Sequence, residues 1–196
     1  MKKLKIPEAL KTEFATVEAV WHTNAETRRV DALVLSWIKY EKQLRRLFSF
    51  FVFQHPKITA DKLDAVIEAF AENRNLYPET FISGIKKLGV TPLPKLLGDS
   101  YTKLWPEIKR IKKYRNKIMH GQHTGQGITS AQLEQDIVCI INWITELAKA
   151  ADAAFGYDGL RRKTYVAAKA SSNLPVQRYP FQTPAGLKRW LSKLDS

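Results

Sequence analysis

The chain has 196 residues, of which 44% are hydrophobic, and its formal net charge at pH 7 is +13. This length and this hydrophobic fraction suffice for a domain with a buried core, and they exclude disorder throughout the chain. The charge does not select a fold, but it favours a polyanionic partner, either nucleic acid or an acidic protein. The alternative is a basic protein that binds no polyanion.

Helical periodicity dominates the sequence, without strand alternation and without an internal repeat. Pro7 begins a first short helix over about 7–21. A long second helix is expected over about 25–54, and Thr59 is placed to cap a third in TADKLDAVIEAFAEN. The segment PETFISGIKKLG predicts a short helix that ends at a glycine.

Two more helices are predicted on either side of the glycine-rich loop GQHTGQG. Pro106 fits the first position of a helix that reads PEIKRIKKYRNKIMH and ends at Gly121. Thr129 and Gln132 predict a capping box before a long helix over about 130–155. The apolar face of this last helix consists of Leu133, Ile137, Ile140, Ile141, Ile144, Leu147 and Ala151.

The segment after Gly156 is basic and irregular, and a small helix is expected in PAGLKRWLSKL. We therefore predict an all-α helical bundle over residues 1–155, with its core at about 25–155. Residues 156–196 are expected to form a basic C-terminal arm rather than a second domain.

The single cysteine, Cys139, lies in the apolar run IVCII, where a buried, unreactive thiol is expected. A chain with one cysteine forms no internal disulfide, which suits a reducing cytoplasm. The N-terminus lacks the apolar core of a signal peptide, and the run FSFFVF is too short to span a bilayer. We therefore expect a cytoplasmic protein without a membrane partner.

A charge interrupts the apolar stripe of the predicted helix that follows Pro106. Each residue of an ideal helix advances by about 100°, which places Leu104, Ile108, Ile111 and Ile118 on one stripe. Arg115 falls in the middle of that stripe. Because a buried guanidinium without a partner is unfavourable, something must compensate this charge.

Glu41 occupies a similar position in the long second helix, between Trp37 and Leu44. Two opposite charges on apolar faces suggest that Glu41 pairs with Arg115. The pattern leaves three alternatives open: a buried salt bridge without chemistry, long side chains that reach water, or a polar cleft, which a subunit interface could form.

Asn116 and His120 are four residues apart and share one helix face, whereas Arg115 points about 140° away from His120. A long arginine side chain, fraying at Gly121, or a second copy of the helix across a dimer axis would bring the groups together. The alternative for His120 is a favourable charge against the helix dipole.

The segment Arg115-Asn116-Lys117-Ile118-Met119-His120 resembles the Arg-x4-His motif of the HEPN superfamily (higher eukaryotes and prokaryotes nucleotide-binding domain). The resemblance covers roughly residues 25–155, and it includes the all-α context and the position of the motif near a helix end. It implies an HEPN-like, metal-independent endoribonuclease without a cofactor, often a toxin or an antiviral-defence effector. It also implies a symmetric homodimer that brings two motifs into one cleft.

The resemblance assigns roles to three residues. His120 would move protons while the ribose 2′-OH attacks the adjacent phosphate, Arg115 would hold that phosphate, and Asn116 would orient the phosphate or His120. The expected products are a 2′,3′-cyclic phosphate and a 5′-OH. Glu41 is a candidate for orienting Arg115, on the stripe pattern alone.

Basic residues predict the RNA-binding surface, with solubility as the alternative role. Lys109, Arg110, Lys112, Lys113 and Lys117 surround the motif, and Arg161 and Arg162 would extend the RNA path or bind an acidic antitoxin. Some HEPN toxins continue the motif as His-x-Tyr, whereas Gly121 and Gln122 follow His120, so regulation at such a tyrosine is not expected.

The four histidines lack the spacing of a metal site. The rival interpretation is a non-catalytic helical module that binds nucleic acid or a partner protein.

Overall fold

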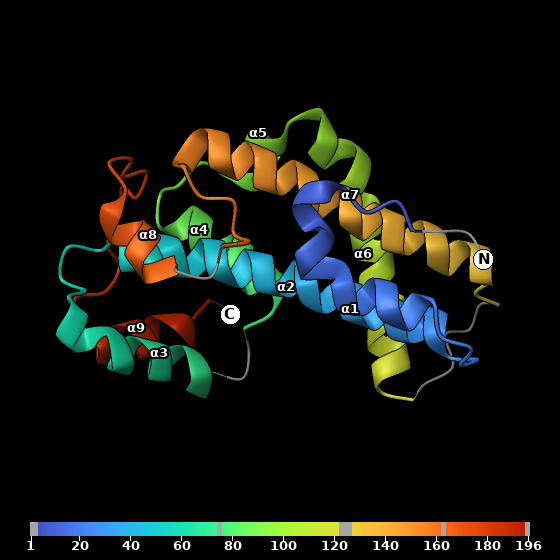
Figure 1. Ribbon diagram of the computed structural model, residues 1–196. Coiled ribbons are helices and arrows are strands. Elements are labelled where there is room, and N and C mark those ends of the chain that lie inside the picture. The colour runs from blue at the N-terminus through green and yellow to red at the C-terminus, as the bar shows by residue number, and fades with distance from the viewer. Residues whose placement is uncertain (1–3, 74–75, 122–126, 162–163, 195–196) are drawn as a thin grey trace. The chain divides into compact units, whose positions relative to one another are not determined.

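The computed structural model describes residues 4–73, 76–121, 127–161 and 164–194, and throughout these residues the regular structure is helical, without strands (Figure 1). This confirms the predicted all-α helical bundle. The chain divides into two compact units, each assembled from two stretches of sequence. The first unit combines residues 1–40 and 97–149, and the second combines 41–96 and 150–196.

Four long helices contribute to the first unit, preceded by the short 3-10 helix η1 (Glu8–Leu10). They are α1 (Lys11–Trp21), the beginning of α2 (Arg28–Phe53), α6 (Asp99–Met119) and most of α7 (Ser130–Phe155).

Two contacts show the relative direction of α1 and α2. The ion pair of Lys39 and Glu13, with 3.8 Å between Nζ and Oε1, joins the end of this part of α2 to the beginning of α1. At the other end, the Arg29 guanidinium lies 5.7 Å from the centroid of the Trp21 ring. The helices α1 and α2 are therefore antiparallel.

The helices α6 and α7 are antiparallel by the same reasoning. Ser100 donates a hydrogen bond of 3.3 Å to Glu146 near one end, and the rings of Trp105 and Trp143 lie 5.5 Å apart in the middle. Trp143 also lies 6.1 Å from the ring of Tyr40 on α2. A bundle of four helices thus holds α6, whose last turns carry the predicted motif.

The predicted beginning of α6 at Pro106 is wrong, because the helix begins at Asp99 and Pro106 lies inside it. A proline inside a helix removes one backbone hydrogen bond, here to the carbonyl of Thr102. Thr102 and Pro106 are both exposed, so water can reach that carbonyl. The aromatic residues of the first turns favour this earlier beginning, since Tyr101 and Trp105 stack at 5.3 Å.

Three predicted helix ends are confirmed. Glycines follow α6 and α7, and Thr129 caps the beginning of α7. Gly121 follows α6 with a φ of +62°, and Gly156 follows α7 with a φ of +70°, values that a residue without a side chain adopts readily. The Thr129 hydroxyl accepts a hydrogen bond of 3.2 Å from the N–H of Gln132. The Gln132 side chain does not complete the box but donates to Asp136 at 2.9 Å.

The second unit contains the remainder of α2 and the end of α7 together with shorter helices. These are η2 (Ala60–Lys62), α3 (Leu63–Glu72), α4 (Pro78–Lys87), α5 (Leu93–Leu97) except its last residue, α8 (Thr164–Ala170) and α9 (Pro184–Leu191). The helix α9 is the one expected in PAGLKRWLSKL, and it packs beside α3 (Figure 1).

The core of the second unit is aromatic and includes residues of the C-terminal segment. The ring of Phe48 on α2 lies 5.8 Å from Phe70, 5.7 Å from Phe81 and 5.9 Å from Trp190. The Tyr157 ring stacks on Phe50 at 4.7 Å, and both side chains are buried. Residues after 156 therefore supply part of a hydrophobic core as well as basic surface.

Candidate functional site

The last two turns of α6 bring Arg115 and Asn116 together. Nη1 of Arg115 donates a hydrogen bond to Oδ1 of Asn116 at 3.2 Å. Both side chains are half-buried, so each has part of its surface in solvent. A bond between adjacent side chains restricts the guanidinium to a smaller set of orientations before any ligand arrives.

The half-buried position of Arg115 agrees with the stripe seen in the sequence. Ile108 and Ile111 are buried against the bundle, while Leu104 and Ile118 are half-buried. Arg115 continues this row toward the helix end, where the side chain is half-buried.

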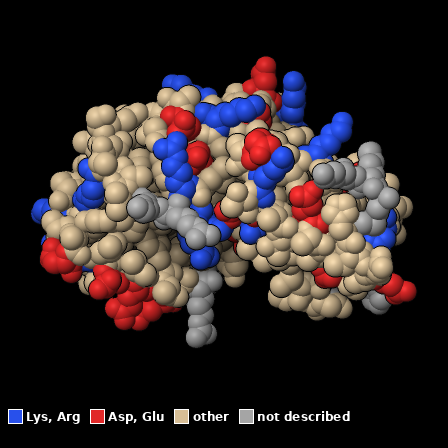
Figure 2. All heavy atoms as spheres, in the orientation of Figure 1, with Lys and Arg blue, Asp and Glu red and all other residues tan. Residues whose placement is uncertain are grey.

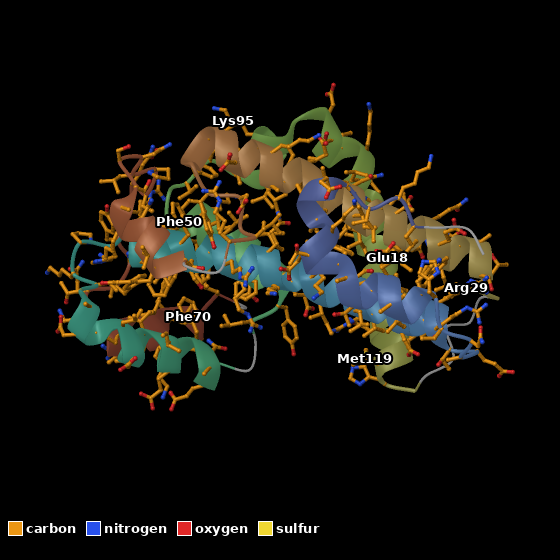
Figure 3. The ribbon with its side chains drawn as sticks, in the orientation of Figure 1. Glu18, Arg29, Phe50, Phe70, Lys95 and Met119 are labelled. Atoms are coloured by element: carbon orange, nitrogen blue, oxygen red, sulfur yellow. The ribbon has the colours of Figure 1, made fainter. Side chains whose placement is uncertain are left out.

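His120 lies at the C-cap of α6 and its side chain is exposed. Its backbone N–H donates to the carbonyl of Asn116 at 3.1 Å, which places it one turn after Asn116. Its neighbour Met119, labelled in Figure 3 at the end of α6, is 54% exposed. The structure therefore unites Arg115 with Asn116 and leaves the imidazole accessible at the end of the same helix.

The predicted RNA-binding lysines of α6 divide into two groups. Lys109 and Lys113 are exposed, whereas Lys112 and Lys117 are half-buried. Figure 2 shows basic side chains over much of the face in view, interspersed with acidic ones, and a group of acidic side chains at its lower left. The exposed pair is therefore better placed to meet a phosphate chain than the half-buried pair.

A buried ion pair between α6 and α7 escaped the sequence-based prediction. Asp136 of α7 is fully buried, and one of its oxygens pairs with Nη2 of Arg110. The same guanidinium donates 2.8 Å hydrogen bonds to Glu107 and to the Tyr114 hydroxyl. Gln132 donates to the same carboxylate, so Asp136 has partners from both helices.

This network sets the charge state of Arg110. Partial burial alone would lower the pKa of Arg110, but the hydrogen bonds to Asp136, Tyr114 and Glu107 together raise that pKa above its ordinary value. The residue therefore stays a cation that is committed to Asp136. It joins α6 to α7 a little over one turn before Arg115.

The other predicted site residues lie in the second unit. Glu41 is a half-buried residue of α2, and its role in orienting Arg115 stays a prediction. Arg161 is exposed and forms ion pairs of 2.9 Å with Asp152 and 3.5 Å with Asp158. Arg162 lies outside the described residues, as do residues 122–126 of the predicted glycine-rich loop.

Cys139 is poorly suited to nucleophilic catalysis. Burial raises the pKa of the Cys139 thiol to about 11, so the thiolate that nucleophilic catalysis needs is scarce near neutral pH. Across the described ranges, no group of histidine, cysteine, aspartate and glutamate side chains is arranged to hold a metal ion. The described helices also include none with the length and apolar character for crossing a membrane.

Comparisons of this chain with family models, curated proteins and solved structures give no match. The function is therefore inferred from the residues of the site and their geometry, together with the sequence resemblance of residues 115–120.

Proposed function

We propose that this chain is a metal-independent endoribonuclease of the HEPN type. The observation that carries the proposal is the end of α6, where Arg115 and Asn116 are hydrogen-bonded and His120 is exposed one turn after Asn116. The reaction is attack of a ribose 2′-OH on the adjacent phosphorus, which forms a 2′,3′-cyclic phosphate and releases a 5′-OH.

Arg115 has the chemistry to stabilise the charge that develops on the phosphate. A guanidinium carries five N–H donors in a plane, and the hydrogen bond to Asn116 helps to orient that plane. Hydrogen bonds from an arginine to a phosphate are strengthened by charge, and a donor that is already oriented does not have to reorganise during the reaction.

His120 has the accessibility that proton transfer to RNA requires. Its imidazole accepts the proton of the 2′-OH as the bond between the 2′ oxygen and phosphorus forms. The bond from phosphorus to the 5′ oxygen then breaks, and that oxygen takes a proton in its turn. A homodimer with two facing motifs would supply a second imidazole for this step, and we include that dimer in the proposal.

The wider role is proposed on the same basis. RNA is the substrate, with Lys109 and Lys113 as exposed contacts to its phosphates. The resemblance of residues 115–120 to the HEPN motif implies a toxin or an antiviral-defence effector, and the partner of a toxin would be an antitoxin protein. An acidic antitoxin would complement the net charge of +13.

A non-catalytic module that binds nucleic acid or protein is the second candidate. The observation in its favour is the position of His120, because an exposed histidine at a helix C-terminus is stabilised by the helix dipole without any catalysis. Binding of RNA without cleavage is the result that this candidate predicts.

Replacing Arg115 with alanine tests the proposed function. Labelled RNA is incubated in EDTA with the parent protein, with Arg115→Ala, and with Lys103→Ala, which removes an exposed cation of the same helix. Removing one donor to a developing negative charge typically slows a reaction by about 10²–10³-fold, so we expect that loss for Arg115→Ala and a rate near that of the parent for Lys103→Ala. Circular dichroism should show that both variants fold.

Two results would refute this role of Arg115. One is a folded Arg115→Ala protein that cleaves at the parental rate. The other is an unfolded Arg115→Ala protein together with a His120→Ala protein that cleaves normally, which would make Arg115 a structural ion-pair residue only.

A further inference from the structure

A hollow of about 570 Å³ opens in the second unit, between the segment that precedes α9 and the helix itself. This volume falls within the range of about 300–1,000 Å³ that is typical of small-ligand pockets. We call it the α9 pocket, and its lining residues are Pro180, Phe181, Gln182, Thr183, Gly186, Arg189, Trp190 and Lys193.

The apolar part of the α9 pocket is a fixed aromatic surface. The Trp190 ring lies 5.4 Å from Phe181 and stacks on Phe48 at 5.9 Å with 30° between the planes. Phe48 and Phe181 are buried, whereas Trp190 is half-buried and lines the pocket. An aromatic side chain that is braced on one side and lines a pocket on another can stack on a planar ligand with little loss of entropy.

The segment that carries Phe181 is held in place by His55. The carbonyl of Phe181 accepts a hydrogen bond of 2.7 Å from Nε2 of His55, while Nδ1 accepts one of 3.0 Å from the N–H of Lys57. Burial lowers the pKa of His55, in keeping with the neutral ring that these two bonds require. Thr183, the N-cap of α9, accepts a hydrogen bond of 3.1 Å from the N–H of Gly186. The wall of the pocket is therefore formed before a ligand binds.

The polar part of the α9 pocket is cationic. Arg189 and Lys193 are exposed, and among the described residues Arg189 forms no ion pair. The adjacent Lys188, outside this pocket, differs because it pairs with Glu72 of α3 at 2.5 Å. The two neighbouring cations of α9 thus have different roles, since one is compensated by the fold and the other is available to an anion.

We infer that the α9 pocket binds one nucleotide of single-stranded RNA, with the base on Trp190 and the phosphate at Arg189. A nucleotide combines a planar ring and an anion at a short distance, which is the combination that the pocket offers. An acidic peptide would satisfy the cations but would leave the Trp190 indole without a planar partner. This inference rests on the proposed function, because the RNA held here is the substrate that the α6 motif would cleave.

Nuclear magnetic resonance of the full chain can test the pocket without any cleavage. The probe is a hexauridylate in which every 2′-OH is methylated, so the 2′-OH reaction cannot occur. The indole N–H signal of Trp190, assigned by its loss in Trp190→Phe or through backbone correlations, should shift on addition of the probe. A titration should show binding about tenfold weaker for Arg189→Ala, which loses a charge-assisted contact to phosphate. The matched control Lys188→Ala should stay within about twofold, because an exposed ion pair contributes little to the fold.

Three outcomes would overturn the inference: a Trp190 signal that does not move, equal weakening in Arg189→Ala and Lys188→Ala, or an equal shift on addition of a penta-glutamate peptide. This experiment tests RNA binding by the α9 pocket and the proposed ribonuclease activity independently of each other. Selective binding of the probe by a protein that leaves ordinary RNA intact would refute the nuclease alone. Cleavage of ordinary RNA without a response at Trp190 would refute the pocket alone.

Discussion

Replacing His120 with alanine should slow RNA cleavage by about 10²–10⁴-fold, the range in which a positioned acid or base usually contributes. The side chain is exposed at the C-cap of α6, so its removal leaves no cavity in the bundle. The measurement is the initial rate of cleavage of a labelled oligoribonucleotide in EDTA, with the protein in excess over the RNA so that chemistry rather than product release is observed.

The chain offers a closely matched control in His22. This histidine is also exposed and lies at the C-cap of α1, so His22→Ala removes the same side chain from an equivalent helix position. We expect His22→Ala to cleave at the parental rate. Equal rates for all three proteins would show that the imidazole of His120 takes no part in the chemistry, and equal losses in both variants would point to a general effect on the charge or stability of the chain.

Replacing Arg110 with alanine should lower the free energy of unfolding by about 3–5 kcal/mol, the usual cost of removing one partner of a buried ion pair. The reason is the burial of Asp136, which is 0% exposed and loses the guanidinium that compensates its charge. Urea denaturation followed by far-ultraviolet circular dichroism measures the change, with Lys103→Ala as a control for an exposed cation of the same helix.

Replacing the other member of the pair, Asp136, with alanine should lower the free energy of unfolding by less than Arg110→Ala does. In Asp136→Ala the group that loses a partner is Arg110, whose side chain is 30% exposed and keeps Glu107 as a partner. Because the guanidinium can turn toward water, we expect a loss of about 1.5–3 kcal/mol, the contribution of hydrogen bonds to a charged group. A smaller effect for Arg110→Ala than for Asp136→Ala would contradict the assignment of Asp136 as the group that depends on its partner.

The sequence predicted the existence and order of the long helices well, because each carries an apolar stripe that repeats with the helical period. It also predicted three of their ends, at Gly121, Thr129 and Gly156, since the side chains that cap helices act locally. The beginning of α6 was predicted wrongly at Pro106. Local preference favours proline at a first helical position, but the stacking of Tyr101 and Trp105 with Trp143 on α7 extends the helix backward.

The Arg110–Asp136 ion pair could not be predicted from the sequence around Arg110 alone. Arg110 lies within a basic run, and nothing in that run distinguishes it from its lysine neighbours. A signal did exist on the other helix, because Asp136 lies on the apolar face between Leu133 and Ile140. The test that identified Arg115 and Glu41, a charge within an apolar stripe, would have identified Asp136 as well. The choice of its partner depends on how α6 and α7 pack, which no single segment encodes.

The candidate site was predicted in part. The stripe placed Arg115 among apolar residues but left its burial open, and in the structure it is half-buried and hydrogen-bonded to the adjacent Asn116. The α9 pocket was not anticipated, since it depends on His55 holding a segment that is 126 residues away in the chain.

The most direct test of the central claim is the chemistry of the RNA ends. The parent protein is incubated in EDTA with an oligonucleotide that contains one ribonucleotide among deoxynucleotides, and with its all-deoxy counterpart, and the products are identified by mass spectrometry. The account predicts a single cut after the ribonucleotide, with a 2′,3′-cyclic phosphate on one product and a 5′-OH on the other, and an intact all-deoxy strand. Cleavage of the all-deoxy strand, products with a 5′-phosphate, or no cleavage of any RNA would contradict it.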